Sequence, residues 1–341
     1  MSRRKILLHV GHGKTGTSFL QSAFANSIDA LAAAGISYPL ADKEVERVRK
    51  GGISSGNGTP APGHLRKMVT RGDETLLLSN EGLFFRLKPH GLLDVMRENA
   101  PEADFEVLIY VRDPMDHAVS KYQQQVKRGG STETFEEFLK TYNHPAVVAN
   151  FIRWLEAQDI PVHVRNYSRH RSDLLQSFEA LLGVSTSVLT PPDVKNVNRS
   201  MTNSEIALQI AFNKTMLTAA SKFISDPLCE QLPNIRSERP EATPEALDAF
   251  LKRMTRLISQ HGLDARLGEA ERYHIPPLDE VTARFDAPDP ERTFSFSRAQ
   301  LEVLVASVSE EIRTGSSVKA ENKARRDKRE MKARKRAKAD K

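Results

Sequence analysis

KILLHVGHGKTGTSFL, residues 5–20, is the stretch that decides the fold of this chain. Residues 5–10 form a short apolar run between charged residues and glycine, which is typical of a buried strand. A glycine-rich loop follows, and after it apolar side chains recur at helical spacing at Leu20, Phe24, Ile28 and Leu31. The stretch therefore predicts a strand, a tight loop and a helix over 17–33, in that order.

The loop between this strand and helix has the composition of an anion-binding site. Its glycines let backbone N–H groups turn inward, and the N-terminus of the helix carries partial positive charge. Lys14 adds a full charge, and neighbouring hydroxyls add hydrogen-bond donors. The usual nucleotide-triphosphate loop differs, because its lysine follows the second glycine, whereas Lys14 precedes Gly16. A plain turn that happens to contain lysine is the alternative.

Further strands and helices alternate along the first 200 residues. Apolar runs predict strands over 75–79, 105–111 and 161–166, with 36–38 as a further candidate. Helix starts lie between them, at Asp113-Pro114 and at the capping box of Thr134 and Glu137. This alternation predicts an α/β fold, a parallel sheet flanked by helices. The glycine-rich segment 51–63 is expected to be a loop with a binding role or disorder.

Beyond about residue 200 the patterns become helical. Helix starts are predicted at Thr202, Thr243 and Ser297, each followed by apolar residues at helical spacing. We therefore expect one domain over 1–318, strand-rich in 1–200 and helical in 201–318. The lone Cys229 excludes a disulfide scaffold and a cysteine-rich zinc site.

No apolar run approaches the length of a membrane span, and the run at 6–10 is too short for a signal peptide. With a single cysteine, these features predict a cytoplasmic protein. The last 23 residues, 319–341, contain twelve Lys or Arg and four Asp or Glu, so this tail carries +8 and the rest of the chain −2. We expect a solvated helix or disorder there. The tail is either a solubilising end or a segment that attracts a polyanion or an anionic membrane surface, which would make the protein peripheral at the membrane. No specific nucleic-acid site is predicted.

A second anion-binding candidate follows the strand over 105–111. Arg112 stands at the carboxyl end of that strand, directly before a capped helix, where open α/β sheets bind ligands. A guanidinium binds phosphate through two hydrogen bonds and keeps its charge. A surface ion pair with Asp116 is the alternative. Asp113 and Asp116 are candidate magnesium ligands, but a helix cap and a first-turn acid explain them better.

Together these motifs resemble sulfotransferases that use 3′-phosphoadenosine 5′-phosphosulfate (PAPS). Residues 13–19, GKTGTSF, resemble the family's 5′-phosphosulfate loop, with Gly13 where proline is common. Arg112 and Ser120, eight residues apart, resemble its 3′-phosphate signature, and residues 164–167 resemble a strand that ends in a tyrosine near adenine. The resemblance spans about residues 5–215. It lacks the Arg-Lys-Gly triplet of many eukaryotic members, for which Arg199 is a candidate substitute.

The resemblance implies a P-loop-type sulfotransferase fold and PAPS as co-substrate. The donor-binding residues it implies are Gly13, Lys14, Thr15, Gly16, Thr17, Ser18, Phe19, Arg112, Ser120 and Tyr167. The implied reaction moves a sulfuryl group to a hydroxyl or amine, in bacterial members most commonly of a carbohydrate or glycolipid. Lys14 would stabilise charge on the bridging oxygen. A sulfuryl group bears less negative charge than a phosphoryl group, so no metal is expected to be required.

The reaction also needs a base to take the proton of the acceptor. Glu81 follows the strand over 75–79 on the ligand side of the predicted sheet and resembles a glutamate of bacterial members, so it is the first candidate. His12 and His64 are the next candidates. Two further functions stay open: a P-loop kinase or NTPase that needs magnesium and ATP, and a non-enzymatic polyanion-binding protein that acts through the tail.

Overall fold

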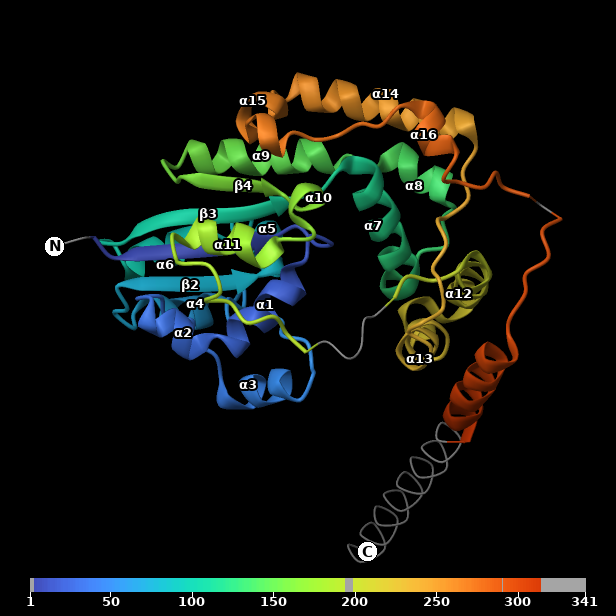
Figure 1. Cartoon of the computed structure of the whole chain (residues 1–341), viewed down its shortest axis with the longest axis horizontal. Helices are drawn as coiled ribbons and strands as arrows, with labels where there is room; N and C mark the ends of the chain where they lie inside the picture. Colours follow the sequence, from blue (N-terminus) through green and yellow to red (C-terminus); the bar gives the residue numbers. More distant parts are fainter. Residues whose placement is uncertain (1–2, 194–198, 290, 314–341) are drawn as a thin grey trace, which may run out of the picture. The chain divides into compact units, whose positions relative to one another are not determined.

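The centre of the fold is a parallel sheet of four strands (Figure 1). The computed structural model describes residues 3–193, 199–289 and 291–313. The strands are β1 (Lys5–Gly11), β2 (Thr75–Asn80), β3 (Asp104–Val111) and β4 (Val162–Asn166), in the order β2-β1-β3-β4. β1 pairs with β2 from Lys5↔Thr75 and with β3 from Lys5↔Asp104. The predicted α/β class and parallel sheet are confirmed.

Alternate residues of the strands supply the two cores of this sheet. Ile6, Leu8 and Val10 of β1 belong to a buried cluster that also includes Leu76 and Val107. Leu7, Leu77 and Leu108 belong to a second buried cluster on the opposite face. Because side chains alternate along a strand, burial on both faces requires a nearly continuous apolar run. This requirement explains why residues 5–10 and 105–111 could be recognised as strands.

Helices cover both faces of the sheet. One face packs against α4 (Pro62–Val69), α5 (Glu81–Arg86), α6 (Leu92–Asn99), α9 (His144–Glu156), α14 (Pro244–Gln260) and α15 (Leu263–Leu267). The other packs against α1 (Thr17–Asn26), α2 (Ile28–Ala33) and α11 (Leu174–Leu182). The remaining elements outside the second unit are α3 (Asp42–Arg49), α8 (Phe135–Thr141), α10 (Tyr167–His170), η2 (Glu269–Glu271) and α16 (Leu278–Thr282). The helix α7 (Pro114–Gly129) contributes residues to both units, and the division falls after residue 122.

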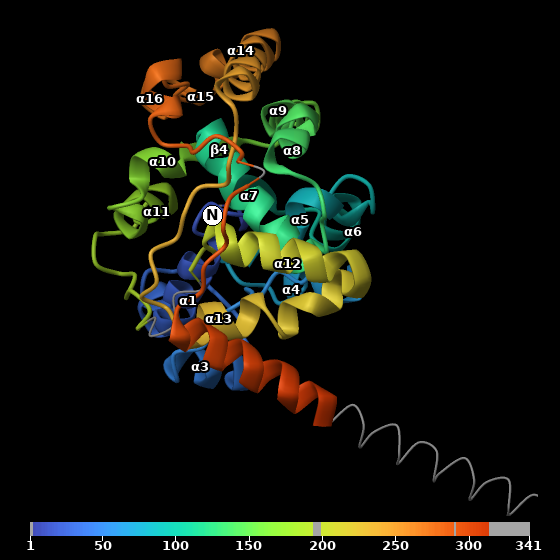
Figure 2. The same ribbon diagram turned by 90° about the vertical axis from the view of Figure 1, so that its right-hand side faces the viewer.

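The chain divides into two compact units. The first, which contains the sheet, draws its described residues from 1–122, 134–196 and 241–288. The second draws on 123–133, 197–240 and 289–341 and includes α12 (Asn203–Met216), η1 (Leu217–Lys222), α13 (Ser225–Gln231) and a helix over 298–313. In the second unit, Ile224 and Leu228 pack with Leu304 of that last helix. Figure 2 shows this helix beside α13. The described residues after β4 contain no strand, as the helical pattern predicted.

Several local predictions can be compared with the structure directly. The capping box of Thr134 and Glu137 is formed, and so are those that begin α12 and the helix over 298–313. The helix predicted over 17–33 is interrupted at Ser27, which separates α1 from α2. The strand predicted over 36–38 is only a single bridge, Ser37 to Leu76.

The predicted loop over 51–63 is shorter than expected, because α4 begins at Pro62. It is also anchored to the sheet. The side chain of Asn57 donates to the carbonyl of Leu77 at 2.9 Å and accepts from the N–H of Ser79 at 2.9 Å. Gly58 donates from its backbone to the carbonyl of Ser79 at 3.1 Å. These contacts fix the middle of the loop against β2.

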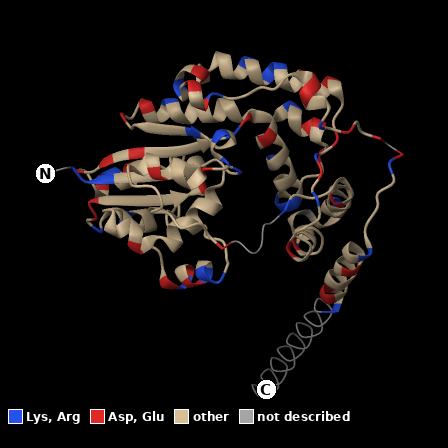
Figure 3. Cartoon of the chain, viewed as in Figure 1, with Lys and Arg blue, Asp and Glu red and all other residues tan. Residues whose placement is uncertain are grey.

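Charged side chains of both signs are spread over the helices, whereas β2 contains none (Figure 3). None of the helices within 3–193, 199–289 and 291–313 combines the length and apolar character that crossing a bilayer requires. The basic tail, 319–341, lies outside the described residues.

Candidate functional site

The strand order places the two predicted anion-binding segments next to each other. β1 has β2 on one side and β3 on the other, and β4 continues beyond β3. After β1 the chain continues to β2 on one side, and after β3 it continues to β4 on the other side. The boundary between β1 and β3 is therefore a topological switch point. Ligands of open α/β sheets bind beyond the carboxyl ends of the strands at such points. The loop after β1 and Arg112 after β3 both lie at this position.

The loop after β1 is wound tightly before α1 begins. Gly13, Lys14 and Gly16 have φ values of 85°, 60° and 78°, in the left-handed region. Successive residues in such conformations turn backbone N–H groups to one side, which suits an anion. Thr15 and Thr17 are buried, and their hydroxyl oxygens are 3.4 Å apart. Ser18 and Phe19 are exposed on the first turn of α1, which contains no acidic residue.

Arg112 and Tyr167 lie against this loop. Nη1 of Arg112 donates a hydrogen bond to the main-chain carbonyl of Lys14 at 3.1 Å. The guanidinium also lies over the ring of Tyr167, 5.5 Å from its centre. A Cβ added to Gly16 would come within 2.8 Å of Cε2 of Tyr167, so the ring packs directly on the loop. The carboxyl ends of β1, β3 and β4 thus bring Lys14, Arg112 and Tyr167 together.

Arg112 is half-buried, and burial lowers its pKa while the nearby carboxylate of Asp116 acts in the opposite direction. An arginine stays protonated through such a shift, so Arg112 remains a cation. Ser120 is half-buried on α7, two turns beyond the start of that helix. The predicted donor-binding residues therefore all lie in the first unit, on the loop, on α1, on α7 and at the ends of β3 and β4.

Glu81 lies beside the loop at the carboxyl end of β2. It is the first residue of α5, whose N-cap Asn80 accepts from the N–H of Gly82 at 2.7 Å. Cγ of Glu81 would be 3.2 Å from a Cβ added to Gly11. Burial raises the pKa of Glu81, and the positive charges of Lys14 and Lys121 oppose that shift. A carboxyl group with a raised pKa next to an anion-binding loop suits proton transfer.

Lys121 is a site residue that sequence reasoning missed. It is half-buried on α7, and burial lowers its pKa while Glu81 opposes the shift. Its Nζ lies 6.0 Å from the centre of the Phe85 ring. A signal was present, because Lys121 directly follows Ser120 in the second motif.

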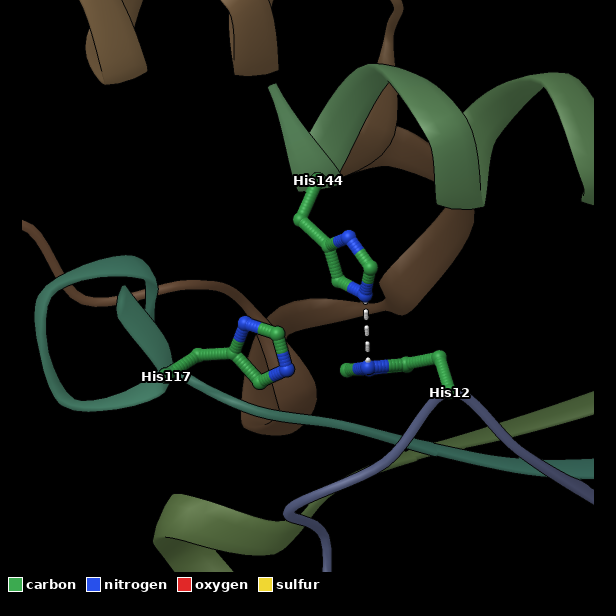
Figure 4. A group of neighbouring side chains, drawn as sticks. All are labelled: His12, His117 and His144. Carbon is green, nitrogen blue, oxygen red and sulfur yellow. Dashed lines mark hydrogen bonds between the residues drawn. The ribbon is translucent and has the colours of Figure 1, made fainter. Parts of the chain in front are cut away.

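Three histidines gather beside the loop, and sequence reasoning singled out only one of them. His12 comes from the loop, His117 from α7 and His144 from the start of α9 (Figure 4). Nε2 of His144 and Nδ1 of His12 are 3.1 Å apart, within hydrogen-bond distance. Burial lowers the pKa of all three, that of His144 to about 4. The three rings are therefore neutral at physiological pH.

His64 and Asp113 are both engaged by neighbouring groups of the protein. Nε2 of His64 is bonded to the carbonyl of Asn57 at 2.6 Å. Asp113 directly precedes α7, and its carboxylate accepts from the side chain of Asn166 and the N–H of His274, each at 2.9 Å. The carboxylate of Asp113 therefore joins β4 to the segment after α15.

Arg199 does not serve as a phosphate ligand in this structure. Its guanidinium binds the carboxylate of Glu205 through two hydrogen bonds of 2.7 Å and the carbonyl of Leu232 at 2.7 Å. The ion pair is buried within the second unit. Arg199 is therefore a structural residue that ties the start of α12 to its neighbours.

Comparison with known proteins agrees with the geometry of the first unit. A model of the sulfotransferase domain matches residues 4–173, a range that contains all four strands and every predicted donor-binding residue. A search of curated proteins found no match. With that domain matched over about half of the chain, and with both predicted anion-binding segments at one switch point, the chain belongs to the sulfotransferase family, whose members transfer sulfuryl groups.

Proposed function

We propose that this protein transfers the sulfuryl group of PAPS to a hydroxyl or amine of an acceptor, with a carbohydrate or glycolipid as the first choice. The observation that carries this proposal is the hydrogen bond between Arg112 and the main chain of Lys14. It joins the cation at the end of β3 to the loop at the end of β1. A donor with anionic groups at both ends fits two neighbouring cationic segments better than a donor with one.

The residues around this contact have distinct roles in the proposal. The backbone N–H groups of 13–18 and the ammonium of Lys14 hold the 5′-phosphosulfate. Arg112 and Ser120 hold the 3′-phosphate. The rings of Phe19, on α1, and Tyr167, on α10, contact the adenine.

The chemistry is an in-line displacement at sulfur. The acceptor oxygen or nitrogen forms a bond to sulfur while the bond from sulfur to the bridging phosphate oxygen breaks. Negative charge grows on that bridging oxygen, where Lys14 stabilises it, an effect of the kind worth a few kcal/mol. The acceptor's proton passes to Glu81, and the other product is adenosine 3′,5′-bisphosphate. This route requires no metal ion.

A turnover assay tests this function. The purified full chain is incubated with PAPS, a panel of saccharides, glycolipids and phenols, and a chelator, and release of adenosine 3′,5′-bisphosphate is measured. We expect acceptor-dependent release that Lys14→Ala abolishes and that Lys67→Ala, an exposed lysine on α4, leaves unchanged. Equal release by Lys14→Ala and the unaltered chain would contradict the proposal.

A magnesium-dependent kinase is the main rival, and it predicts consumption of ATP that stops when the chelator is added. The engagement of Asp113 by Asn166 and His274 argues against that rival, because the carboxylate is already used by the protein. For location, we propose the cytoplasm, since the single cysteine, Cys229, is a buried free thiol.

A further inference from the structure

Three imidazoles from three separate segments converge at one point beside the phosphate loop (Figure 4). His12 belongs to the loop, His117 to the first turn of α7 and His144 to the first turn of α9. Each ring offers one nitrogen, and these nitrogens all lie within 4.8 Å of one another. His12 and His117 are buried, and His144 is half-buried.

Hydrogen bonds account for most of these nitrogens but not for all. His117 donates from Nε2 to the carbonyl of Gly13 at 3.2 Å, so its neutral ring accepts at Nδ1 from the hydroxyl of Tyr142 at 2.8 Å. His12 and His144 are bonded to each other. Nε2 of His12 is buried and has no hydrogen-bond partner among the residues that the structure describes. A buried polar atom without a partner costs stability, and here the protein's own hydrogen bonds leave one ring nitrogen of the cluster unsatisfied.

We propose that His12, His117 and His144 bind one divalent transition-metal ion of the zinc class. Neutral imidazole nitrogen is a preferred ligand of Zn²⁺, Co²⁺, Ni²⁺ and Cu²⁺. Zinc–nitrogen bonds of about 2.0–2.1 Å place the nitrogens of a tetrahedral site roughly 3.3 Å apart. Nδ1 of His12 and Nε2 of His144 already have nearly that separation, at 3.1 Å.

Tyr142 supplies the outer contact that such a site needs. Metal-binding histidines usually donate their second ring N–H to a neighbouring oxygen, which fixes the tautomer. If Nε2 of His117 binds the metal, Nδ1 carries the proton and donates it to the hydroxyl oxygen of Tyr142, 2.8 Å away. The same contact therefore serves both states of the ring.

Metal binding and the present loop conformation exclude each other. Nε2 of His117 cannot donate to the carbonyl of Gly13 and bind a metal at the same time. The ion would therefore release the residue that precedes Lys14, in a turn that depends on left-handed backbone at both positions. Lys121 and Arg112 also lie close enough to affect the histidines electrostatically, and they repel a dication. The site therefore suits a reversible, inhibitory ion better than a resident one, an effect on turnover that rests on the proposed function.

Direct metal binding tests the site without reference to activity. The chelator-treated full chain, His144→Ala and the control His90→Ala, an exposed histidine, are dialysed against Zn²⁺, and bound metal is measured. We expect one Zn²⁺ per chain for the unaltered protein and the control, and at least tenfold weaker binding for His144→Ala. Equal binding by all three would overturn the proposal and assign the metal to other histidines.

A second measurement does not depend on any variant. Co²⁺ bound by three imidazoles in a tetrahedral site absorbs visible light through d–d transitions much more strongly than hydrated Co²⁺ does. We expect that absorption with the unaltered chain at one equivalent of Co²⁺, and its absence would overturn the site even if His144→Ala failed to fold.

The inhibitory effect has its own test. We expect Zn²⁺ to inhibit turnover of the unaltered chain and to inhibit His144→Ala at least tenfold less. Binding of one Zn²⁺ per chain without inhibition of turnover would overturn the inference that the ion acts on the phosphate loop. Absence of all turnover would refute the proposed function, while the dialysis and the Co²⁺ spectrum would still decide whether the metal site exists.

Discussion

Arg112 donates a hydrogen bond to the main-chain carbonyl of Lys14 at 3.1 Å, between residues 98 positions apart in the chain. The contact joins the carboxyl ends of β1 and β3, which are neighbours in the sheet. A guanidinium has five N–H donors, so this one bond does not use up the hydrogen-bonding capacity of the side chain. Arg112 and Lys14 are thereby neighbours at one edge of the sheet, which the proposed donor site requires.

Replacement of Glu81 tests the proposed base. We expect Glu81→Gln to lower kcat by roughly 10²–10⁴-fold, the range usual for loss of a general base. Binding of adenosine 3′,5′-bisphosphate should change little, because glutamine keeps the shape of the side chain. Initial rates and calorimetric titration measure the two effects, with the exposed Glu98→Gln as the matched control. A Glu81→Gln variant with unchanged kcat would return the role of base to another group.

The pH dependence of turnover follows from the raised pKa of Glu81. A base must be ionised, so activity should rise with pH through a pKa above the ordinary glutamate value of about 4.3. The folded state then binds more protons than the unfolded state, so the contribution of Glu81 to stability falls as pH rises through that range. At neutral pH, Glu81→Gln should therefore be at least as stable as the unaltered chain in thermal denaturation. Clear destabilisation by this substitution would contradict the burial argument.

Two glycines of the phosphate loop separate backbone strain from packing. Gly13 and Gly16 both have positive φ, but only at Gly16 would an added Cβ meet other atoms, 2.7 Å from Leu174 and 2.8 Å from Tyr167. Gly13→Ala should lower the free energy of unfolding by about 1–2 kcal/mol, through backbone strain alone. Gly16→Ala should cost more and should also weaken nucleotide binding, because the Tyr167 ring must move. Chemical denaturation and titration of both variants measure this, and equal effects would show that Tyr167 does not pack on the loop.

The anchored loop over 51–61 gives a test of stability away from the chemistry. A Cβ added to Gly56 would lie 2.0 Å from the carbonyl oxygen of Ser79, and Gly56 has a φ of 79°. We expect Gly56→Ala to lower the free energy of unfolding by roughly 3 kcal/mol. The control Gly63→Ala, in open space on α4, should be neutral or slightly stabilising. A harmless Gly56→Ala would mean that the loop is not held against β2.

Deletion of 319–341 distinguishes the enzyme from a binder that acts through its tail. An enzyme should keep its turnover of a small acceptor, because the site described above lies in the first unit. Affinity for a polyanion or for anionic vesicles should fall and lose its salt dependence. Turnover that disappears with the tail would favour a function that depends on the tail.

The sequence predicted the sheet well because burial on both faces demands continuous apolar runs, as in 5–10 and 105–111. The strand predicted over 36–38 is only a single bridge, at Ser37. Ile36 and Tyr38 are buried there, so their apolar pattern reports burial and not a strand. The loop, Arg112 and Glu81 could be found because each follows directly on a strand. His117 and His144 were missed because their proximity depends on how α7 and α9 pack beside the loop, which spacing along the chain does not encode. Lys121 was missed although it directly follows Ser120.

Calorimetric titration with adenosine 3′,5′-bisphosphate in the presence of a chelator tests the central claim most directly. Lys14→Ala and Arg112→Ala should each weaken binding by roughly ten- to a hundredfold, the loss expected for hydrogen bonds to a charged group. The double variant should bind more weakly still, and the controls Lys67→Ala and Arg66→Ala, both exposed on α4, should match the unaltered chain. Binding that persists unchanged in the double variant would show that these two cations do not hold one nucleotide.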